Sequence, residues 1–205
     1  MRINRSIAIF VLMLSMLCGA SASQAASISA SSLVRNFYDQ LTDTMKQGEK
    51  LGFDGRFKKM EPVVSSIYNM PLMTRFAVGP SWSTAKPEQQ QKMIEAFAMF
   101  SAATYASRFT RYDGEKFEVI GEKPSSGGGI IVETKLTPKD SEPVSLNYVV
   151  RNDETGNPRI VDVLLDSTIS ELATRRSEFS SIVKREGMDA LIIMLNDKSK
   201  KMGST

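Results

Sequence analysis

Histidine is absent from all 205 residues of this chain. Its absence removes the commonest general base, the commonest zinc ligand and every nucleophile that depends on a histidine partner. Catalysis would have to use paired carboxylates or a lysine, and neither occurs in a recognisable motif. We therefore expect no enzyme activity, no bound metal and no cofactor.

Long apolar runs are absent except at the N-terminus, which has the pattern of a secretory signal peptide. Arg2 and Arg5 precede an apolar run over residues 7–17, and small residues follow it. These small residues allow cleavage after Ala25 or one position later. Because the run is short for a bilayer span, we expect residues 1–25 to be removed and a soluble periplasmic protein to remain.

Cysteine occurs once, at Cys18, inside this N-terminal segment. Lipid-modified cysteines follow a small residue, whereas Cys18 follows Leu17, so lipidation is not expected. The exported chain would then hold no cysteine, although its compartment permits disulfides. Its stability must come from its core, and we expect a single domain over residues 27–200 with a disordered tail at 201–205.

An excess of charge of one sign is also missing. The 26 basic and 23 acidic residues give +3, and without Arg2 and Arg5 the balance is 24 against 23, or +1. Basic and acidic residues are mixed along the chain. We therefore expect no nucleic acid partner and no strong electrostatic capture by an anionic membrane surface.

Apolar residues recur at helical spacing in the first half of the chain. The pattern predicts one helix around residues 34–45 and a second around 60–68. A short apolar segment over 71–78 stops at the breaker pair Gly79-Pro80, and Pro87 then opens a long helix that reaches to about residue 112.

The apolar period then changes to two residues and predicts four strands, within 116–119, 130–136, 144–151 and 161–166. Each predicted strand has one apolar and one polar face, which is typical of an antiparallel sheet covered on one side. The glycines at 127–129 lead into a strand, whereas an anion-binding loop opens a helix, so they indicate a turn.

Two further helices are predicted, around residues 169–183 and 188–195, with Gly187 between them. The order of helices, strands and helices predicts an α+β fold, in which a twisted antiparallel sheet of about four strands is covered on one face by helices. The helices are rich in methionine and phenylalanine. From pattern alone, such residues indicate a packed core more often than a ligand cavity.

The segment from Asn69 reads Asn-Met-Pro-Leu-Met-Thr-Arg-Phe-Ala-Val-Gly-Pro-Ser-Trp. Further positions along the chain are Gln90, Gln91, Phe97, Tyr105, Arg108 and Phe109, and then Asp162, Val163, Ser170, Arg175, Phe179, Gly187, Leu191, Ile192 and Leu195. In this order they resemble the MlaC, or toluene-tolerance, family of periplasmic phospholipid carriers. Residues 105–109 and 114–117 are most similar to the branch associated with hopanoid biosynthesis.

This resemblance implies a pocket for lipid acyl chains between the helices and the sheet, with the headgroup near solvent. It also implies a monomeric carrier that shuttles lipid between an inner-membrane ABC transporter with MCE domains and an outer-membrane lipoprotein or porin complex. The cargo stays open, because a hopanoid is a rigid polycycle and a phospholipid has two flexible chains.

Periodicity and resemblance together give the candidate site residues. The candidates for lipid contact are Val63, Ile67, Leu72, Phe76, Met93, Phe97, Phe100, Tyr105, Phe117, Val132, Leu146, Tyr148, Val161, Val163 and Leu165. Of these, the strand residues Val132, Leu146, Tyr148, Val161 and Val163 should form one wall, and Phe76, Phe97 and Phe100 part of the other. The candidates for headgroup or partner contact are Arg108, Arg175 and Arg176, for which a solvated helix face is the alternative.

Two other functions remain as alternatives. An envelope interaction module could bind another protein through its helices and carry no lipid. A glycan-active hydrolase could use carboxylates such as Glu115, Glu118 or Glu122, although acids along a strand edge usually form a solvated face.

Overall fold

Residues 29–204 are described by the computed structural model, so the expected signal peptide lies outside the described residues. The helices before the sheet are α1 (Ala30–Lys46), α2 (Gly48–Ile67), α3 (Met70–Val78), the short 3-10 helix η1 (Gly79–Thr84) and α4 (Pro87–Arg108). The sheet consists of β1 (Lys116–Pro124), β2 (Ile130–Thr137), β3 (Val144–Asn152), β4 (Pro158–Leu165) and β5 (Ile169–Ser170). The last two helices are α5 (Glu171–Glu186) and α6 (Met188–Met202).

Side-chain caps fix where several helices begin. Ser29, Asn69 and Ser170 accept hydrogen bonds from backbone N–H groups in the first turns of α1, α3 and α5. Such caps satisfy donors that the helix itself leaves unpaired. Proline at the first position of α4 costs no hydrogen bond there and favours the helix start.

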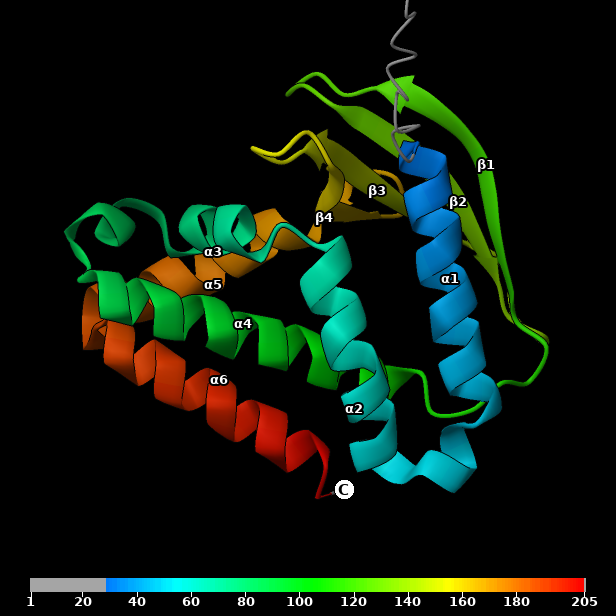
Figure 1. Cartoon of the computed structure of the whole chain (residues 1–205), viewed down its shortest axis with the longest axis horizontal. Coiled ribbons are helices and arrows are strands. Elements are labelled where there is room, and N and C mark those ends of the chain that lie inside the picture. The colour runs from blue at the N-terminus through cyan, green and yellow to red at the C-terminus, as the bar shows by residue number, and fades with distance from the viewer. Residues whose placement is uncertain (1–28, 205) are drawn as a thin grey trace, which may run out of the picture.

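The sheet is antiparallel throughout, in the order β1-β2-β3-β4-β5. It curves around α1, which lies against β1, β2 and β4 (Figure 1). The helices α3, α4, α5 and α6 pack on one another beside the sheet, and both α3 and α5 contact β4. The predicted α+β fold, with helices over one face of an antiparallel sheet, is therefore confirmed.

Several elements differ from the predictions, and α2 begins at Gly48 although the pattern predicted a helix around residues 60–68. The long helix α4 ends at Arg108, before residue 112, and the chain then leads to β1. The short strand β5 was not predicted, because two residues carry no periodicity. The tail expected to be disordered from residue 201 is helical up to Met202, whose side chain packs against the core.

A bulge changes which residues of β4 face the core. Tyr148 pairs with Val163, whereas Val150 pairs with Ile160, so Val161 has no partner in the register. Ile160 is fully buried in the core cluster, and Val161 is buried outside that cluster. The inward position predicted for Val161 is therefore wrong, since strict alternation does not survive a bulge.

No helix within residues 29–204 combines the length and the apolarity needed to cross a bilayer.

Candidate functional site

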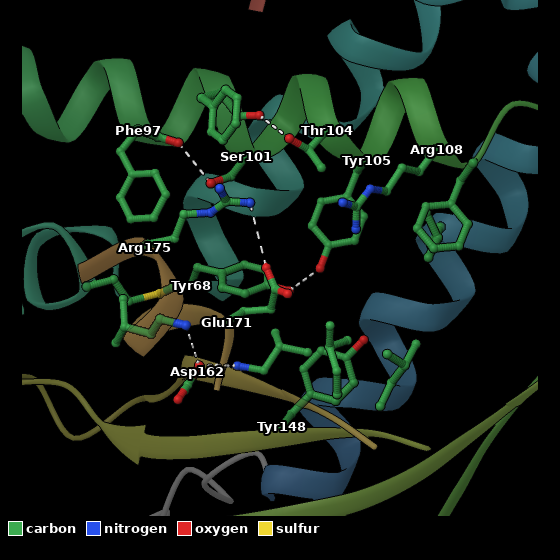
Figure 2. A pocket seen from close by; sticks show the side chains of 18 of the residues that line it. Tyr68, Phe97, Ser101, Thr104, Tyr105, Arg108, Tyr148, Asp162, Glu171 and Arg175 are labelled. Atoms are coloured by element: carbon green, nitrogen blue, oxygen red, sulfur yellow. Dashed lines mark hydrogen bonds and ion pairs between the residues drawn. The ribbon is translucent and has the colours of Figure 1, made fainter. Parts of the chain in front are cut away.

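A cavity of about 160 Å³ lies between α4, α5 and the concave face of the sheet (Figure 2). One enclosed water needs roughly 10–15 Å³, so the cavity is far larger than a gap between packed side chains. Its apolar lining comes from both layers and consists of Leu41, Met73, Phe97, Phe100, Phe109, Phe117, Leu146, Val163, Leu165 and Leu172.

The helical wall of the cavity is one face of α4. Phe97, Phe100, Ser101, Thr104, Tyr105 and Arg108 recur at intervals of three and four residues, which brings them to the same side of the helix. The hydroxyls of Ser101 and Thr104 each donate to the carbonyl oxygen four residues earlier, at 2.8 Å. Their donors are thus used within the helix, and the two side chains present their remaining atoms to the cavity.

Four charged residues also line the cavity, and we refer to them as its charged edge: Arg108, Asp162, Glu171 and Arg175. The carboxylate of Asp162 accepts hydrogen bonds from Ser170 Oγ at 2.6 Å and from the backbone N–H groups of Leu172 and Val163 at 3.0 and 2.8 Å. Asp162 therefore ties the beginning of α5 to β4. A carboxylate with three donors is a structural anchor of this edge.

The two arginines of the edge differ in how strongly they are held. Arg175 Nη1 lies 2.9 Å from Glu178, Nη2 lies 3.6 Å from Glu171, and the guanidinium rests 5.4 Å from the centre of the Phe100 ring. Within residues 29–204, no hydrogen bond or ion pair holds the Arg108 guanidinium, which is exposed. Arg108 is therefore the cation that can accept a new anionic partner at the lowest cost.

Tyrosine hydroxyls line the inner part of the cavity. Tyr68 and Tyr105 meet at an O–O distance of 2.5 Å, and Tyr148 lies beside them on β3 (Figure 2). Burial raises the pKa of Tyr105 to about 12 and that of Tyr68 and Tyr148 well above the usual value. All three hydroxyls thus stay protonated and neutral at any physiological pH.

The chain matches the MlaC protein family over residues 35–197. It belongs to the MlaC family. A solved structure with the same fold is the phospholipid-binding protein from Ralstonia solanacearum, determined in complex with a phospholipid. The TM-score is 0.69 at 22% sequence identity, and the alignment covers 86% of this chain and 99% of that one. No curated protein sequence matches this chain at a significant level.

Ten of the predicted site residues of this MlaC-family chain line the cavity. They are Phe97, Phe100, Tyr105, Phe117, Leu146, Tyr148, Val163, Leu165, Arg108 and Arg175. The structure thus brings together the strand residues and the helix residues that were expected on opposite walls.

Five of the predicted residues lie elsewhere in the interior: Val63, Ile67, Met93, Val132 and Val161. All five are buried, and all but Val161 belong to the main core cluster. The same periodicity marks a residue that packs against a neighbouring helix and one that faces a cavity, so pattern alone does not separate them.

The last three predicted residues, Leu72, Phe76 and Arg176, line a second groove between α3, η1 and α5. Arg176 donates to the carbonyl oxygen of Phe76 at 2.6 Å and lies 4.8 Å from the centre of its ring. Although it follows Arg175 directly, Arg176 leaves α5 in a different direction. The prediction that Phe76 shares a wall with Phe97 and Phe100 is therefore wrong.

Some lining residues were missed by the sequence analysis: Leu41, Tyr68, Met73, Ser101, Thr104, Phe109, Asp162, Glu171 and Leu172. Leu41 and Tyr68 fall within the two helices predicted around residues 34–45 and 60–68. For Asp162, the alternation of apolar and polar residues predicted a solvent-facing side chain, whereas the structure places it in the lining of the cavity.

Acidic residues do not gather into a metal site or into the proposed hydrolase site. In residues 29–204, no group of three or more histidine, cysteine or acidic side chains could hold a metal ion. Glu115, Glu118 and Glu122 lie along β1 and the residue before it, and none of them lines the cavity. Glu122 instead accepts a hydrogen bond from the backbone N–H of Ser31 at 2.7 Å.

Proposed function

We propose that this protein is a lipid carrier whose cargo places its acyl chains in the cavity between α4, α5 and the sheet. The cavity itself carries the proposal, because its lining combines many apolar side chains from both layers with only four charged ones. This division matches a lipid, which has apolar chains and a polar headgroup. Membership of the MlaC family and the phospholipid in the structural neighbour support the same assignment.

The free energy of lipid transfer favours reversible exchange of lipid between the protein and a membrane. Moving about 28 chain methylenes from water into an apolar cavity is favourable by roughly 20 kcal/mol gross, at about 0.8 kcal/mol for each methylene. The same chains gain little when they leave a membrane for the cavity, since both surroundings are apolar. The carrier can therefore exchange lipid with a membrane at either end, and the partners must set the direction.

The cavity must widen when it takes up a whole lipid. Pockets for drug-sized ligands measure about 300–1,000 Å³, and the cavity here measures about 160 Å³. The only elements that can part without breaking a sheet ladder are the helices over the sheet. We infer that α4 and α5 move relative to β3 and β4 as the chains enter.

The proposal places this exchange in the periplasm. The N-terminal pattern of residues 1–25 and the MlaC family both support export. We propose an inner-membrane ABC transporter with MCE domains as one partner, and an outer-membrane lipoprotein or porin complex as the other. The cargo is a phospholipid, or a hopanoid if the resemblance of residues 105–109 and 114–117 to the hopanoid-associated branch reflects function.

The direct test is to identify what the protein carries. We would purify it without detergent from the envelope of cells that produce the full chain, extract it with organic solvent and analyse the extract by mass spectrometry. We expect close to one lipid for each protein molecule, and the mass distinguishes a phospholipid from a hopanoid. In parallel, the purified protein should accelerate transfer of a fluorescent phospholipid between donor and acceptor vesicles.

Absence of any bound lipid, together with no acceleration of transfer, would contradict the carrier and favour the interaction module. Leu146→Asp, which places a charge inside the cavity, should lose the lipid. The matched control is Ile120→Asp, which adds the same charge at a position 66% exposed on β1. This variant should retain the lipid of the wild-type protein.

A further inference from the structure

Four of the five tyrosines of the chain gather at the inner part of the cavity. Tyr68, Tyr105 and Tyr148 line it, and Tyr38 lies directly behind Tyr148, with 5.7 Å between the ring centres. An acyl chain has no group that can form a hydrogen bond with these hydroxyls. The number of hydrogen-bond donors and acceptors in this cluster therefore indicates which polar group the cargo contains.

The first chain of hydroxyls is closed. Thr134 Oγ1 donates its one hydrogen to the carbonyl oxygen of Leu146, so it must accept from Tyr38, whose oxygen lies 2.5 Å away. The hydrogen of Tyr38 is then used. The O–H groups of Tyr38 and Thr134 thus both have acceptors within the protein.

The second pair is open. Tyr68 and Tyr105 own two hydroxyl hydrogens, and the single hydrogen bond between their oxygens uses only one of them. No other hydrogen bond of either hydroxyl is found within residues 29–204. Because Tyr68 is buried and both residues line the cavity, the cavity is the space open to the remaining O–H. Figure 2 shows the contact between the two hydroxyl groups. A buried donor without an acceptor is costly, so a ligand that supplies one is favoured.

We propose that this free O–H of the Tyr68–Tyr105 pair donates to an ester carbonyl of the cargo, so that the protein selects ester-linked glycerolipids. The inference rests on the proposed carrier function. An ester carbonyl is a neutral acceptor that joins the acyl chains to the rest of the lipid, and the pair lines the same cavity as the apolar side chains and the cations Arg108 and Arg175. A purely hydrocarbon polycycle offers no acceptor at this point.

The test compares two lipids that differ only in this carbonyl. Binding of a diester phosphatidylglycerol and of its diether analogue, with the same saturated chains, would be measured by displacement of a fluorescent fatty acid. Wild-type protein should bind the diester about two- to tenfold more tightly, the range of one neutral hydrogen bond. The double variant Tyr68→Phe, Tyr105→Phe should bind both lipids with the affinity that the wild type has for the diether.

The double variant removes both partners of the hydrogen bond and keeps both rings, so neither hydroxyl is left alone. The control is Tyr112→Phe, which alters the tyrosine outside the cluster and should keep the full preference. Preference is read as the ratio of the two affinities, so a general loss of affinity in a variant does not affect it.

A second measurement uses the wild-type protein alone. The infrared stretching band of an isotopically labelled ester carbonyl should move to lower frequency when the lipid is bound, because the carbonyl accepts a hydrogen bond. Equal affinity of the wild type for diester and diether, or a preference that survives in the double variant, overturns the inference and leaves the carrier in place. Failure of the wild type to bind either lipid overturns the inference and also a glycerophospholipid cargo; if extraction of the purified protein then yields no lipid, the carrier function is overturned as well.

Discussion

The carboxylate of Asp162 accepts a hydrogen bond of 2.6 Å from the hydroxyl of Ser170, the residue that caps α5. The same carboxylate accepts from the backbone N–H of Leu172, so one side chain on β4 fixes the first turn of a helix that lines the cavity. An anionic group at a helix N-terminus is also favoured by the helix dipole. This arrangement makes Asp162 the link between the sheet and the charged edge.

Asp162→Ala should lower the free energy of unfolding by about 1–3 kcal/mol, because two backbone N–H groups and the cap hydroxyl lose their acceptor. Urea unfolding followed by circular dichroism measures the loss. The control is Asp140→Ala, in the exposed turn between β2 and β3, which should stay within about 0.5 kcal/mol of the wild type. Equal stability of the two variants would contradict the anchoring role.

Leu146→Asp should abolish retention of lipid, because an unpaired carboxylate in an apolar cavity is costly and repels the acyl chains. Mass spectrometry of the extracted protein measures retention. Since Leu146 also packs against the core, the charge can unfold the protein. Ser101→Phe therefore serves as a second variant, which fills the cavity from α4 without adding charge. A folded form of either variant with normal lipid content would contradict the site.

Arg108→Gln should slow the transfer of an anionic phospholipid between vesicles by about two- to fivefold and leave the transfer of a neutral lipid unchanged. The range corresponds to one exposed ion pair of up to about 1 kcal/mol. Arg176→Gln is the matched control, since Arg176 is held against Phe76 in the second groove and should not affect either lipid. Equal slowing of both lipids by Arg108→Gln would instead indicate docking to a partner or membrane.

Four tyrosines should resist ionisation until the protein unfolds in alkali. Burial raises the pKa of Tyr38, Tyr68, Tyr105 and Tyr148 above the usual value of about 10, and that of Tyr105 to about 12. The raised values favour the protonated folded form. This contribution is complete below pH 10 and is lost as the pH rises from about 10 to 12.

An alkaline titration followed by tyrosinate absorbance measures this. The four buried tyrosines should ionise together with the loss of circular dichroism. If these four titrated before the protein unfolded, the buried hydroxyl cluster would be wrong.

The order of helices and strands could be predicted from the sequence, because the spacing of apolar residues reflects local backbone geometry. For the same reason, Leu146 and Val163 were placed correctly on the inner face. Val161 was not, since the bulge that displaces it arises from pairing between β3 and β4. A bulge leaves no mark in the alternation of a single strand.

Contacts between distant segments could not be predicted in the same way. Arg56 is buried and donates to the carbonyl oxygens of Ala106 and Gly48 at 2.8 Å, yet nothing in the spacing of α2 distinguishes it from a solvated arginine. Arg175 and Arg176 are neighbours in sequence but leave α5 in different directions, one into the cavity and one into the second groove.

The sequence by itself determined the fold class, the apolar faces and the absence of histidine chemistry, because each depends on residue type and local period. Only the tertiary structure decided that apolar faces of α4 and the sheet enclose a cavity while other faces meet in full contact. The physical reason is that a cavity is a property of the distance between two layers, which depends on how all the side chains between them pack. Only the tertiary structure could likewise show the contact between the Tyr68 and Tyr105 hydroxyls, since it depends on how the end of α2 packs against α4.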